Sequence, residues 1–310
     1  MNHPSVSTAC PLCGSSSPSD YSVLYTANIP NHSLRKEVFS ARRLPDAIHY
    51  QLVKCNNDQL VRSTPTFPSS VATQLYRKSE VTYQAEVNNL VKSYLDCLAP
   101  VLHKLNKTAN ILEIGCGSGF LLSALRKQGF INVLGIEPST AAAKMADNSI
   151  RKHIITEAFS KKVVKSKHFD LICIFQTLDH MPALSSCMED CYSCLNPGGY
   201  LFSLHHDAEH PLRKLLGEKH PIIDIEHLQL FSQRTSTLLF EKHGLLIEQV
   251  TSPQSVLSLS HLIWLIPLPI RLKKIATRFI KMFPLLNATF HLELGNVAII
   301  GKKPSLTITP

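Results

Sequence analysis

Short apolar runs alternate with amphipathic segments from residue 105 to residue 303, and this pattern predicts strands that alternate with helices. The run at 169–175 is apolar at almost every position, which is typical of a strand covered on both faces. Helices are expected at 120–128 and in the segment that ends at 195. The expected strands lie at 111–114, 132–136, 153–157, 169–175, 200–204, 245–250 and 296–301. This order predicts an α/β fold with a mostly parallel, seven-stranded sheet between two layers of helices.

The first of these apolar runs leads into glycines at alternate positions. Gly115, Gly117 and Gly119 allow positive φ angles and let a ligand approach the main chain where a Cβ would block it. The helix that follows directs its first backbone N–H groups toward the same place. Glu137 ends the next strand, where an acid can accept hydrogen bonds from a ribose diol. The spacing Gly-x-Gly-x-Gly differs from the Gly-x-Gly-x-x-Gly of dinucleotide enzymes.

Glu113, the glycine loop and Glu137 together resemble the class I S-adenosylmethionine (SAM) methyltransferases. The resemblance covers about residues 105–250 and, more loosely, 296–303, and it includes the Asn-Pro-Gly-Gly turn at 196–199. It implies a Rossmann-like sheet whose last strand is antiparallel. It also implies that Glu113 and the glycines hold the methionine part of SAM and that Glu137 holds the ribose. A nucleotide-binding Rossmann relative with another ligand is the alternative.

The resemblance also assigns residues that follow the later strands. It places Gln176 and Thr177, directly after the strand at 169–175, beside the methionine or adenosine moiety. After the third strand, it places Glu157 to accept a hydrogen bond from the adenine amino group and Phe159 to pack on the adenine ring.

The stretch from Val71 to Leu105 precedes the first strand and is amphipathic, with apolar residues at helical spacing, so one of its faces is expected to pack. Helices at this position often cover the SAM pocket in the family. Tyr76 and Tyr83 are therefore candidates to contact the ligand, although packing in the core is the favoured role for both.

Composition limits the class of protein. The chain has 310 residues, of which 44% are hydrophobic, enough for one large and one small domain. It shows neither an N-terminal apolar run of the signal-peptide type nor an apolar stretch long enough to cross a membrane. Its 9 cysteines are then expected as thiols or metal ligands in a reducing, cytoplasmic compartment. The formal net charge of +9 favours acidic partners without choosing among phosphates, nucleic acid and anionic lipid.

Cysteines near the N-terminus have the spacing of a zinc ribbon. Cys10 and Cys13 bracket a tight turn, and a strand-like segment leads into Cys55 and Asp58. Because zinc binds thiolates and accepts a carboxylate oxygen, these four residues are predicted to form a structural zinc site. His49 is the alternative fourth ligand, and a degenerate ribbon with free thiols is the alternative to metal binding. The segment resembles the N-terminal zinc knuckle of a group of bacterial methyltransferases that includes sugar C-methyltransferases.

Histidines gather after the strands whose carboxyl ends face the expected methyl group. His180 follows the fourth strand, His206 ends the fifth, and His227 closes the segment Asp224-Ile-Glu-His. Methyl transfer to an alcohol or a carbon acid needs a group that removes a proton, and imidazole titrates near neutral pH. His206 and His227 are therefore the preferred base candidates, with His180 beside them. A helix N-cap or a supporting hydrogen bond is the alternative role for each, and His205 is expected to point away.

Residues 251–293 form an insertion between the last two expected strands, where the family usually has a short turn. The stretch 271–283 predicts a helix with one apolar stripe and only basic charged residues, as in helices that lie in a lipid headgroup layer. A helical cap over the substrate pocket, with its basic face in water, is the alternative. Pro267 and Pro269 divide the apolar run that contains Trp264, which favours the cap.

The sequence as a whole predicts a zinc-ribbon-like segment at 1–68, a helical lid or linker at 69–106, and a SAM-binding domain at 107–303 with a cap insertion at 251–293. The expected activity is methyl transfer from SAM to oxygen or carbon of a small, glycosidic or amphiphilic acceptor, with peripheral membrane contact through 255–285 as an option. RNA methylation is an alternative, but no RNA-binding signature supports it. A non-catalytic SAM-fold protein that binds a membrane or a partner is the other, and the intact glycine loop argues against it. The oligomeric state is left open.

Overall fold

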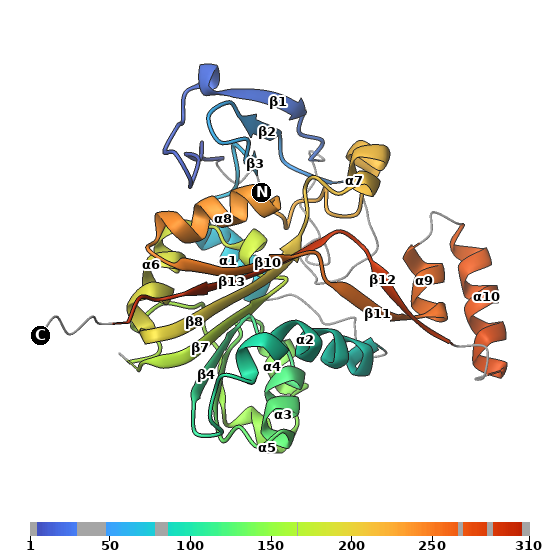
Figure 1. The fold of residues 1–310 in the computed structure, drawn as a ribbon. Coiled ribbons are helices and arrows are strands. Elements are labelled where there is room, and N and C mark those ends of the chain that lie inside the picture. The colour runs from blue at the N-terminus through green and yellow to red at the C-terminus, as the bar shows by residue number, and fades with distance from the viewer. Residues whose placement is uncertain are drawn as a thin grey trace, which may run out of the picture.

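The computed structural model describes residues 5–29, 48–77, 86–165, 167–265, 269–283 and 288–305. Its centre is a sheet of 7 strands in the order β10-β13-β8-β7-β4-β5-β6 (Figure 1). The strands are β4 (Asn110–Ile114), β5 (Asn132–Ile136), β6 (Ile154–Ile155), β7 (Phe169–Phe175), β8 (Leu195–His206), β10 (Leu246–Thr251) and β13 (Asn296–Lys302). β13 is antiparallel to both of its neighbours, and the strands from β8 to β6 are parallel. The predicted α/β fold is confirmed.

Helices cover both faces of this sheet. On one face lie α2 (Val87–Leu102), α3 (Phe120–Lys127), α4 (Thr140–Lys144) and α5 (Asn148–Arg151), and on the other lie α6 (Leu184–Cys194) and α8 (Gln233–Lys242) (Figure 1). Successive residues of a strand point to opposite faces. Accordingly, Ile111 and Leu171 pack in the core with α2 and α3, while Leu112 and Ile172 pack in the core with α6 and α8. The apolar run of β7 is thus covered on both sides, as its composition predicts.

Three elements differ from the predicted ones. β6 has only 2 residues, although the sequence predicts a strand over 153–157. β8 begins at Leu195, so the Asn-Pro-Gly-Gly segment lies inside the strand, where the pairing with β7 becomes irregular. The amphipathic stretch before β4 contains two helices, α1 (Ser69–Arg77) and α2. Residues 78–85 between them, including Tyr83, lie outside the described residues.

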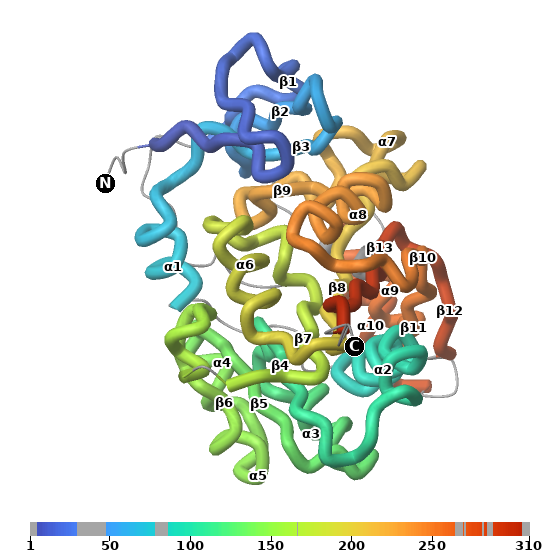
Figure 2. Tube along the Cα trace, turned by 60° about the vertical axis from the view of Figure 1, so that its left-hand side comes forward, coloured from blue at the N-terminus to red at the C-terminus, as the bar shows by residue number. Residues whose placement is uncertain are grey.

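A second sheet of 4 strands, in the order β1-β2-β3-β9, lies at the N-terminal end of the molecule (Figure 2). Its strands are β1 (Tyr21–Tyr25), β2 (Leu52–Cys55), β3 (Val61–Ser63) and β9 (Gln229–Leu230). Because β9 comes from the C-terminal half of the chain, its pairing with β3 joins the N-terminal segment to that half. Lys242 Nζ in α8 adds hydrogen bonds to the backbone oxygens of Pro11 and Leu12, both at 2.8 Å.

Shorter elements connect these layers. They are the single turns η1 (Pro18–Asp20), η4 (Leu178–His180) and η5 (Gly217–Lys219) and the helix α7 (Pro211–Leu216). The turn η4 follows β7 directly and lies at the carboxyl edge of the sheet.

The described residues of the segment 254–293 form an arm that projects from the body of the molecule (Figure 1). It contains the antiparallel strands β11 (Gln254–Ser258) and β12 (Thr289–Glu293) and the helices α9 (Leu259–Leu265) and α10 (Ile270–Met282). The prediction of a helical insertion holds for α9 and α10 but is wrong for the two strands. Each strand is stabilised by a partner far away in the chain, so its own short pattern does not reveal it.

The apolar stripe of α10 is exposed. Leu272, Ile275 and Phe279 are 52%, 66% and 54% exposed, whereas Ile280 is buried. The cap alternative predicts that this stripe packs over the edge of the sheet. The exposure of Leu272, Ile275 and Phe279 is contrary to that prediction. The side chains of Trp264 and Lys281 lie outside the described residues. Within the described ranges, no helix combines the length and apolar character needed to cross a membrane.

Candidate active site

The glycine loop lies at the carboxyl end of β4, where the chain turns into α3. Gly115, Gly117 and Gly119 have φ angles of 75°, 53° and 68°. A Cβ on Gly115 would lie 2.4 Å from Thr177 Oγ1, and a Cβ on Gly119 would lie 2.7 Å from a side-chain carbon of Ile150. Both the backbone angles and the close approach therefore require glycine here.

Two buried acids flank the loop. Glu137 is 9% exposed and accepts hydrogen bonds from the backbone N of Gly117 at 2.8 Å and of Ser139 at 2.7 Å. Glu113 is 2% exposed, and its Oε2 has no hydrogen-bond partner among the described residues. Burial, together with the charge of Glu137, raises the pKa of Glu113 well above its ordinary value. A buried acceptor without a donor fits a ligand that brings one.

The backbone adopts an uncommon conformation directly after β7. Gln176 has a φ of 47°, which non-glycine residues rarely adopt and which clusters at functional sites. Its Nε2 donates to Asn296 Oδ1 at 3.0 Å, while its Oε1 is buried with no partner in the described part of the chain. Thr177 faces Gly115. The structure thus brings Thr177 to the glycine loop, with Gln176 directly before it, and the role of both residues toward SAM stays a prediction.

The two residues predicted to bind adenine lie after β6. Glu157 is exposed, and Phe159 is half-buried and packs against the core on the α6 side of the sheet. Their role toward adenine stays a prediction.

Three histidines surround Asp179 at the carboxyl edge of the sheet. Asp179 lies in η4, close behind Thr177, while His206 ends β8 and His227 precedes β9. His180 Nε2 lies 3.6 Å from Asp179 Oδ1, and His227 Nε2 lies 3.7 Å from Asp179 Oδ2. The ring centroid of His227 is 4.4 Å from that of His180 and 5.4 Å from that of His206. All three predicted histidines therefore form one cluster beside the glycine loop.

Side chains behind the cluster orient its rings. His227 Nδ1 lies 2.8 Å from Asp224 Oδ1, which also accepts from the backbone N of Glu226 and of His227. This carboxylate holds Nδ1 and fixes the ring of His227, so that Nε2 faces Asp179. Tyr76 Oη lies 2.9 Å from His180 Nδ1. Tyr76 thus packs in the core, as favoured, and also supports the site.

Charges within the cluster shift its titration. Burial opposes a charge on His227, but Asp224 and Asp179 outweigh it and raise the pKa of His227 to about 9. Burial, together with the charge of His227, lowers the pKa of His206 well below its ordinary value. Burial also disfavours the charge of Asp179, but the surrounding histidines, His180 first, lower its pKa. Near neutral pH, the ring of His227 is therefore a cation and the ring of His206 is neutral.

The neighbouring His205 points away from the cluster, as expected. It is fully buried, and its ring nitrogens lie 3.1 Å from Ser203 Oγ and 2.7 Å from Ser236 Oγ. Both nitrogens are engaged in the core, so His205 takes no part in the site.

Asn296 is a member of the site that the sequence analysis missed. It pairs in register with His206 at the start of β13. Its Oδ1 accepts from Gln176, and its Nδ2 donates to Ser255 Oγ of the arm at 3.2 Å. Asn296 therefore links the edge of the sheet to the arm. An asparagine before an apolar strand has no sequence signal beyond that of a turn.

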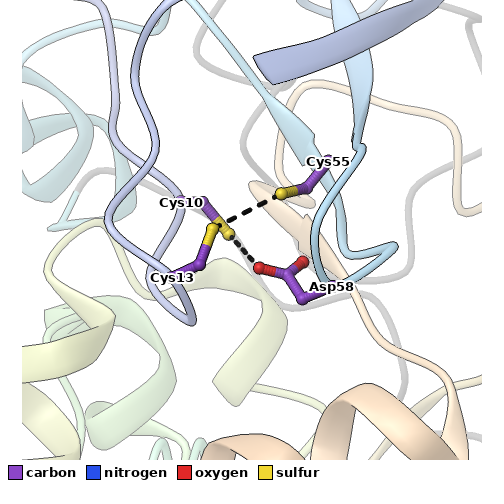
Figure 3. Close-up of side chains that lie close together, drawn as sticks. All are labelled: Cys10, Cys13, Cys55 and Asp58. Atoms are coloured by element: carbon purple, nitrogen blue, oxygen red, sulfur yellow. Dashed lines mark hydrogen bonds between the residues drawn. The ribbon is translucent and has the colours of Figure 1, made fainter.

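The predicted zinc ligands also converge (Figure 3). One ligand atom from each of Cys10, Cys13, Cys55 and Asp58 lies within 4.8 Å of all the others. The sulfurs of Cys13 and Cys55 are 3.5 Å apart, and Cys10 Sγ lies 3.1 Å from Asp58 Oδ2. Three thiols and one carboxylate are a donor set that suits tetrahedral zinc.

His49 is not the fourth ligand, and this alternative is wrong. Its Nδ1 lies 2.7 Å from Tyr50 O, and its Nε2 lies 2.9 Å from Glu218 Oε1. Both ring nitrogens are therefore engaged elsewhere. The fourth member of the cluster is Asp58, whose carboxylate lies beside Cys10 Sγ.

Comparison with known proteins extends this description. A family model described as a methyltransferase domain matches residues 83–250, which is more than half of the chain. A ubiquinone biosynthesis O-methyltransferase of Ralstonia nicotianae is 28% identical over 145 residues, covering 44% of this chain and 58% of the relative. The protein of the same name from Thiobacillus denitrificans is 29% identical over 143 residues, covering 44% and 59%. The matched region thus spans less than two thirds of either relative.

Solved structures show a looser likeness. A SAM-dependent methyltransferase from Archaeoglobus fulgidus has a TM-score of 0.47 at 18% sequence identity, with 71% of this chain and 99% of that chain covered. A SAM-dependent methyltransferase from Thermotoga maritima, described as a possible histamine N-methyltransferase, has a TM-score of 0.46 at 18% identity, with 71% and 92% covered.

Proposed function

The chain belongs to the class I SAM-dependent methyltransferases, and from this membership we propose that it transfers a methyl group to a hydroxyl oxygen of a small amphiphilic acceptor. One observation carries the proposal. Thr177 touches the glycine loop, and Asp179, with its three histidines, follows immediately in η4. Groups that handle a proton thus lie beside the expected cofactor site. The name of the O-methyltransferases from Ralstonia and Thiobacillus favours oxygen over carbon as the methylated atom.

The residues at the loop fit SAM. Glu113 Oε2 and Gln176 Oε1 are buried acceptors without donors among the described residues, and SAM carries ammonium, hydroxyl and amino donors. Glu113 would hold the ammonium group and Glu137 the ribose diol, while Gly115, Gly117 and Gly119 would let the ligand lie against the main chain. Glu157 and Phe159 are proposed for the adenine ring.

When bound, SAM supplies the methyl group, whose bond to sulfur breaks with its electron pair remaining on sulfur. The protein holds the acceptor hydroxyl and receives its proton. His206 is half-buried and neutral near pH 7, so it is the proposed proton acceptor. His227, held by Asp224 and charged near pH 7, would stabilise the negative charge that develops on the acceptor oxygen. His180, held by Tyr76, lines the same space.

A structural zinc ion is proposed at Cys10, Cys13, Cys55 and Asp58. Cys10 and Cys55 are buried in the same core cluster as Leu239 and Phe240 of α8. An ion at this place would cross-link the first loop of the chain to the turn between β2 and β3. The zinc would therefore stabilise the N-terminal sheet and its packing on the large domain.

The arm is proposed to contact an anionic membrane surface, where an amphiphilic acceptor would be found. Ile275 and Phe279 are exposed beside Lys274 and Arg278, which are also exposed. Apolar side chains among basic ones are the pattern of an interfacial helix. The arm begins and ends at the carboxyl edge of the sheet, where Asn296 of β13 pairs with His206. The arm is therefore attached to the body beside the histidine cluster.

The cofactor and the transfer step can be tested separately. Calorimetry should show binding of S-adenosylhomocysteine, and Glu137→Ala should weaken it by about 1.5–3 kcal/mol, whereas Glu189→Ala on the exposed side of α6 should not. With hydroxylated aromatic amphiphiles as acceptors, His206→Asn should lower the rate of methyl transfer and leave the affinity for S-adenosylhomocysteine unchanged. A wild-type protein that binds neither SAM nor its product would overturn the proposal.

A further inference from the structure

Asp179, His206 and His227 are close enough to share one ion. A carboxylate oxygen of Asp179 and one ring nitrogen from each histidine all lie within 4.8 Å of one another. The distance of 3.7 Å between His227 Nε2 and Asp179 Oδ2 is too long for a hydrogen bond. It is close to the separation of about 3.3–3.6 Å that two ligand atoms have on a tetrahedral ion with bonds of about 2.0–2.2 Å.

Buried polar atoms in this cluster lack partners. Asp179 is 1% exposed, and neither of its carboxylate oxygens has a hydrogen-bond partner within the described ranges. His227 Nε2 is also buried and also has no hydrogen-bond partner within the described ranges. Leaving such atoms unpaired is costly. By contrast, both carboxylate oxygens of Glu137 accept backbone N–H groups. A cation between Asp179 and His227 would satisfy the unpaired atoms together.

The surroundings of His227 are those of a metal ligand. Its Nδ1 is held by Asp224 Oδ1 at 2.8 Å, and that oxygen is fixed in turn by two backbone N–H groups. Histidines that bind metals typically donate their second ring N–H to a carboxylate in this way, which orients the ring and leaves the other nitrogen for the ion. The three ligands come from η4, from the end of β8 and from the loop before β9, so the fold itself places them.

We infer that Asp179, His206 and His227 bind one divalent transition-metal cation beside the cofactor site. Two imidazoles and one carboxylate favour zinc, iron(II) or cobalt over magnesium and calcium, which prefer oxygen ligands. Three protein ligands leave coordination positions open. Resting on the proposed function, such a position would take the hydroxyl oxygen of the acceptor and acidify it. In the metal-bound protein the cation would supply the positive charge at the acceptor oxygen. His206 would then be a ligand and would accept no proton, so the proton of the acidified hydroxyl would leave to solvent.

Cobalt(II) titration of the full-length, chelator-treated protein tests the inference. Cobalt at the cysteine cluster gives thiolate-to-metal charge-transfer absorption, whereas cobalt bound by two imidazoles and a carboxylate gives only weaker visible bands. The wild type should bind cobalt without the thiolate signature in addition to any ion at the cysteine cluster. Asp179→Asn and His206→Gln should each lose this cobalt and keep the thiolate-bound one. His243→Gln, at the end of α8 and outside both sets of proposed ligands, should keep both.

Each outcome decides the inference. Cobalt that shows only the thiolate signature in the wild type, or an unchanged stoichiometry in both ligand variants, would overturn it. If the Asp179→Asn variant unfolds, the His206→Gln variant still tests the metal site. The His206 side chain makes no hydrogen bond among the described residues, so its replacement should leave the fold intact. S-adenosylhomocysteine binding is measured on the same samples. Absence of the second cobalt with intact cofactor binding defeats the metal site alone, whereas absence of cofactor binding defeats the proposed methyl transfer alone.

Discussion

Gly115 and Thr177 approach each other so closely that a Cβ on Gly115 would lie 2.4 Å from Thr177 Oγ1. This contact joins the glycine loop after β4 to the turn after β7. It also sets the separation between the expected cofactor site and the histidine cluster, because Asp179 follows Thr177 in η4. The loop and the cluster are therefore parts of one packed unit.

Gly115→Ala should abolish cofactor binding and destabilise the fold. Alanine at a φ of 75° costs about 1–2 kcal/mol, and the clash with Thr177 adds overpacking of about 1–3 kcal/mol. Gly14→Ala is the matched control, since Gly14 has a φ of 79° but no atom within 4 Å of the added Cβ. Thermal unfolding should show a larger loss for the first variant, and equal losses would contradict the steric argument.

Binding of SAM should release a proton from Glu113. Burial and the charge of Glu137 raise the pKa of Glu113, so the folded protein keeps a proton that the unfolded chain loses at lower pH. The stability from this group is present below the unfolded pKa and is lost as the pH rises toward the folded pKa. An ammonium group beside Glu113 favours the carboxylate, so affinity should increase with pH across that window.

Calorimetry in two buffers of different ionisation enthalpy measures this proton. In the wild type the apparent binding enthalpy should differ between the buffers, and Glu113→Gln should remove the difference. An equal buffer dependence in both proteins would show that the proton comes from another group.

The local pattern of the chain predicted the centre of the fold well. β5 and β7 have the predicted bounds. Each is a short, mostly apolar run, and this signal lies within the strand itself. The four residues of the cysteine cluster were also predicted, because the spacing of Cys10 and Cys13 fixes a local turn. These features depend on neighbours in sequence.

Features that depend on distant partners were not predicted. β11 exists because β12 pairs with it across the whole arm. Asn296 joins the site because β13 returns beside β8. His49 has the chemistry of a zinc ligand, but its ring is held by Tyr50 and Glu218. The sequence offered the residues in each case, and only tertiary packing decided between their roles.

The purified protein should contain about one zinc ion per chain at the cysteine cluster. Cys55→Ser should lose this zinc and lower the melting temperature, because Cys55 Sγ lies 3.5 Å from Cys13 Sγ inside the cluster. Cys97→Ser in α2, remote from the ribbon, is the control and should retain the metal. Asp58→Cys should slow the removal of zinc by chelators, since it replaces a carboxylate with a fourth thiolate. Equal metal content in the Cys55 and Cys97 variants would refute the site.

The arm should bind anionic vesicles in a salt-dependent manner. Lys274 and Arg278 are exposed on α10, and basic residues near an anionic surface contribute about 1 kcal/mol each. Lys274→Glu/Arg278→Glu should therefore abolish co-sedimentation with phosphatidylserine vesicles, and added salt should weaken the wild type.

Two matched variants separate the membrane contact from a general effect of charge. Lys161→Glu/Lys162→Glu makes the same change in net charge at exposed residues after β6, outside the arm, and should leave vesicle binding intact. Ile275→Ser/Phe279→Ser keeps every charge but removes apolar side chains that are 66% and 54% exposed, and it should weaken binding even at low salt, because insertion depends on apolar area. If the Lys161/Lys162 variant loses binding as strongly as the arm variants, the whole positive charge of the chain attracts the vesicle and α10 has no special part. If the serine variant binds like the wild type, the exposed stripe does not enter the lipid layer.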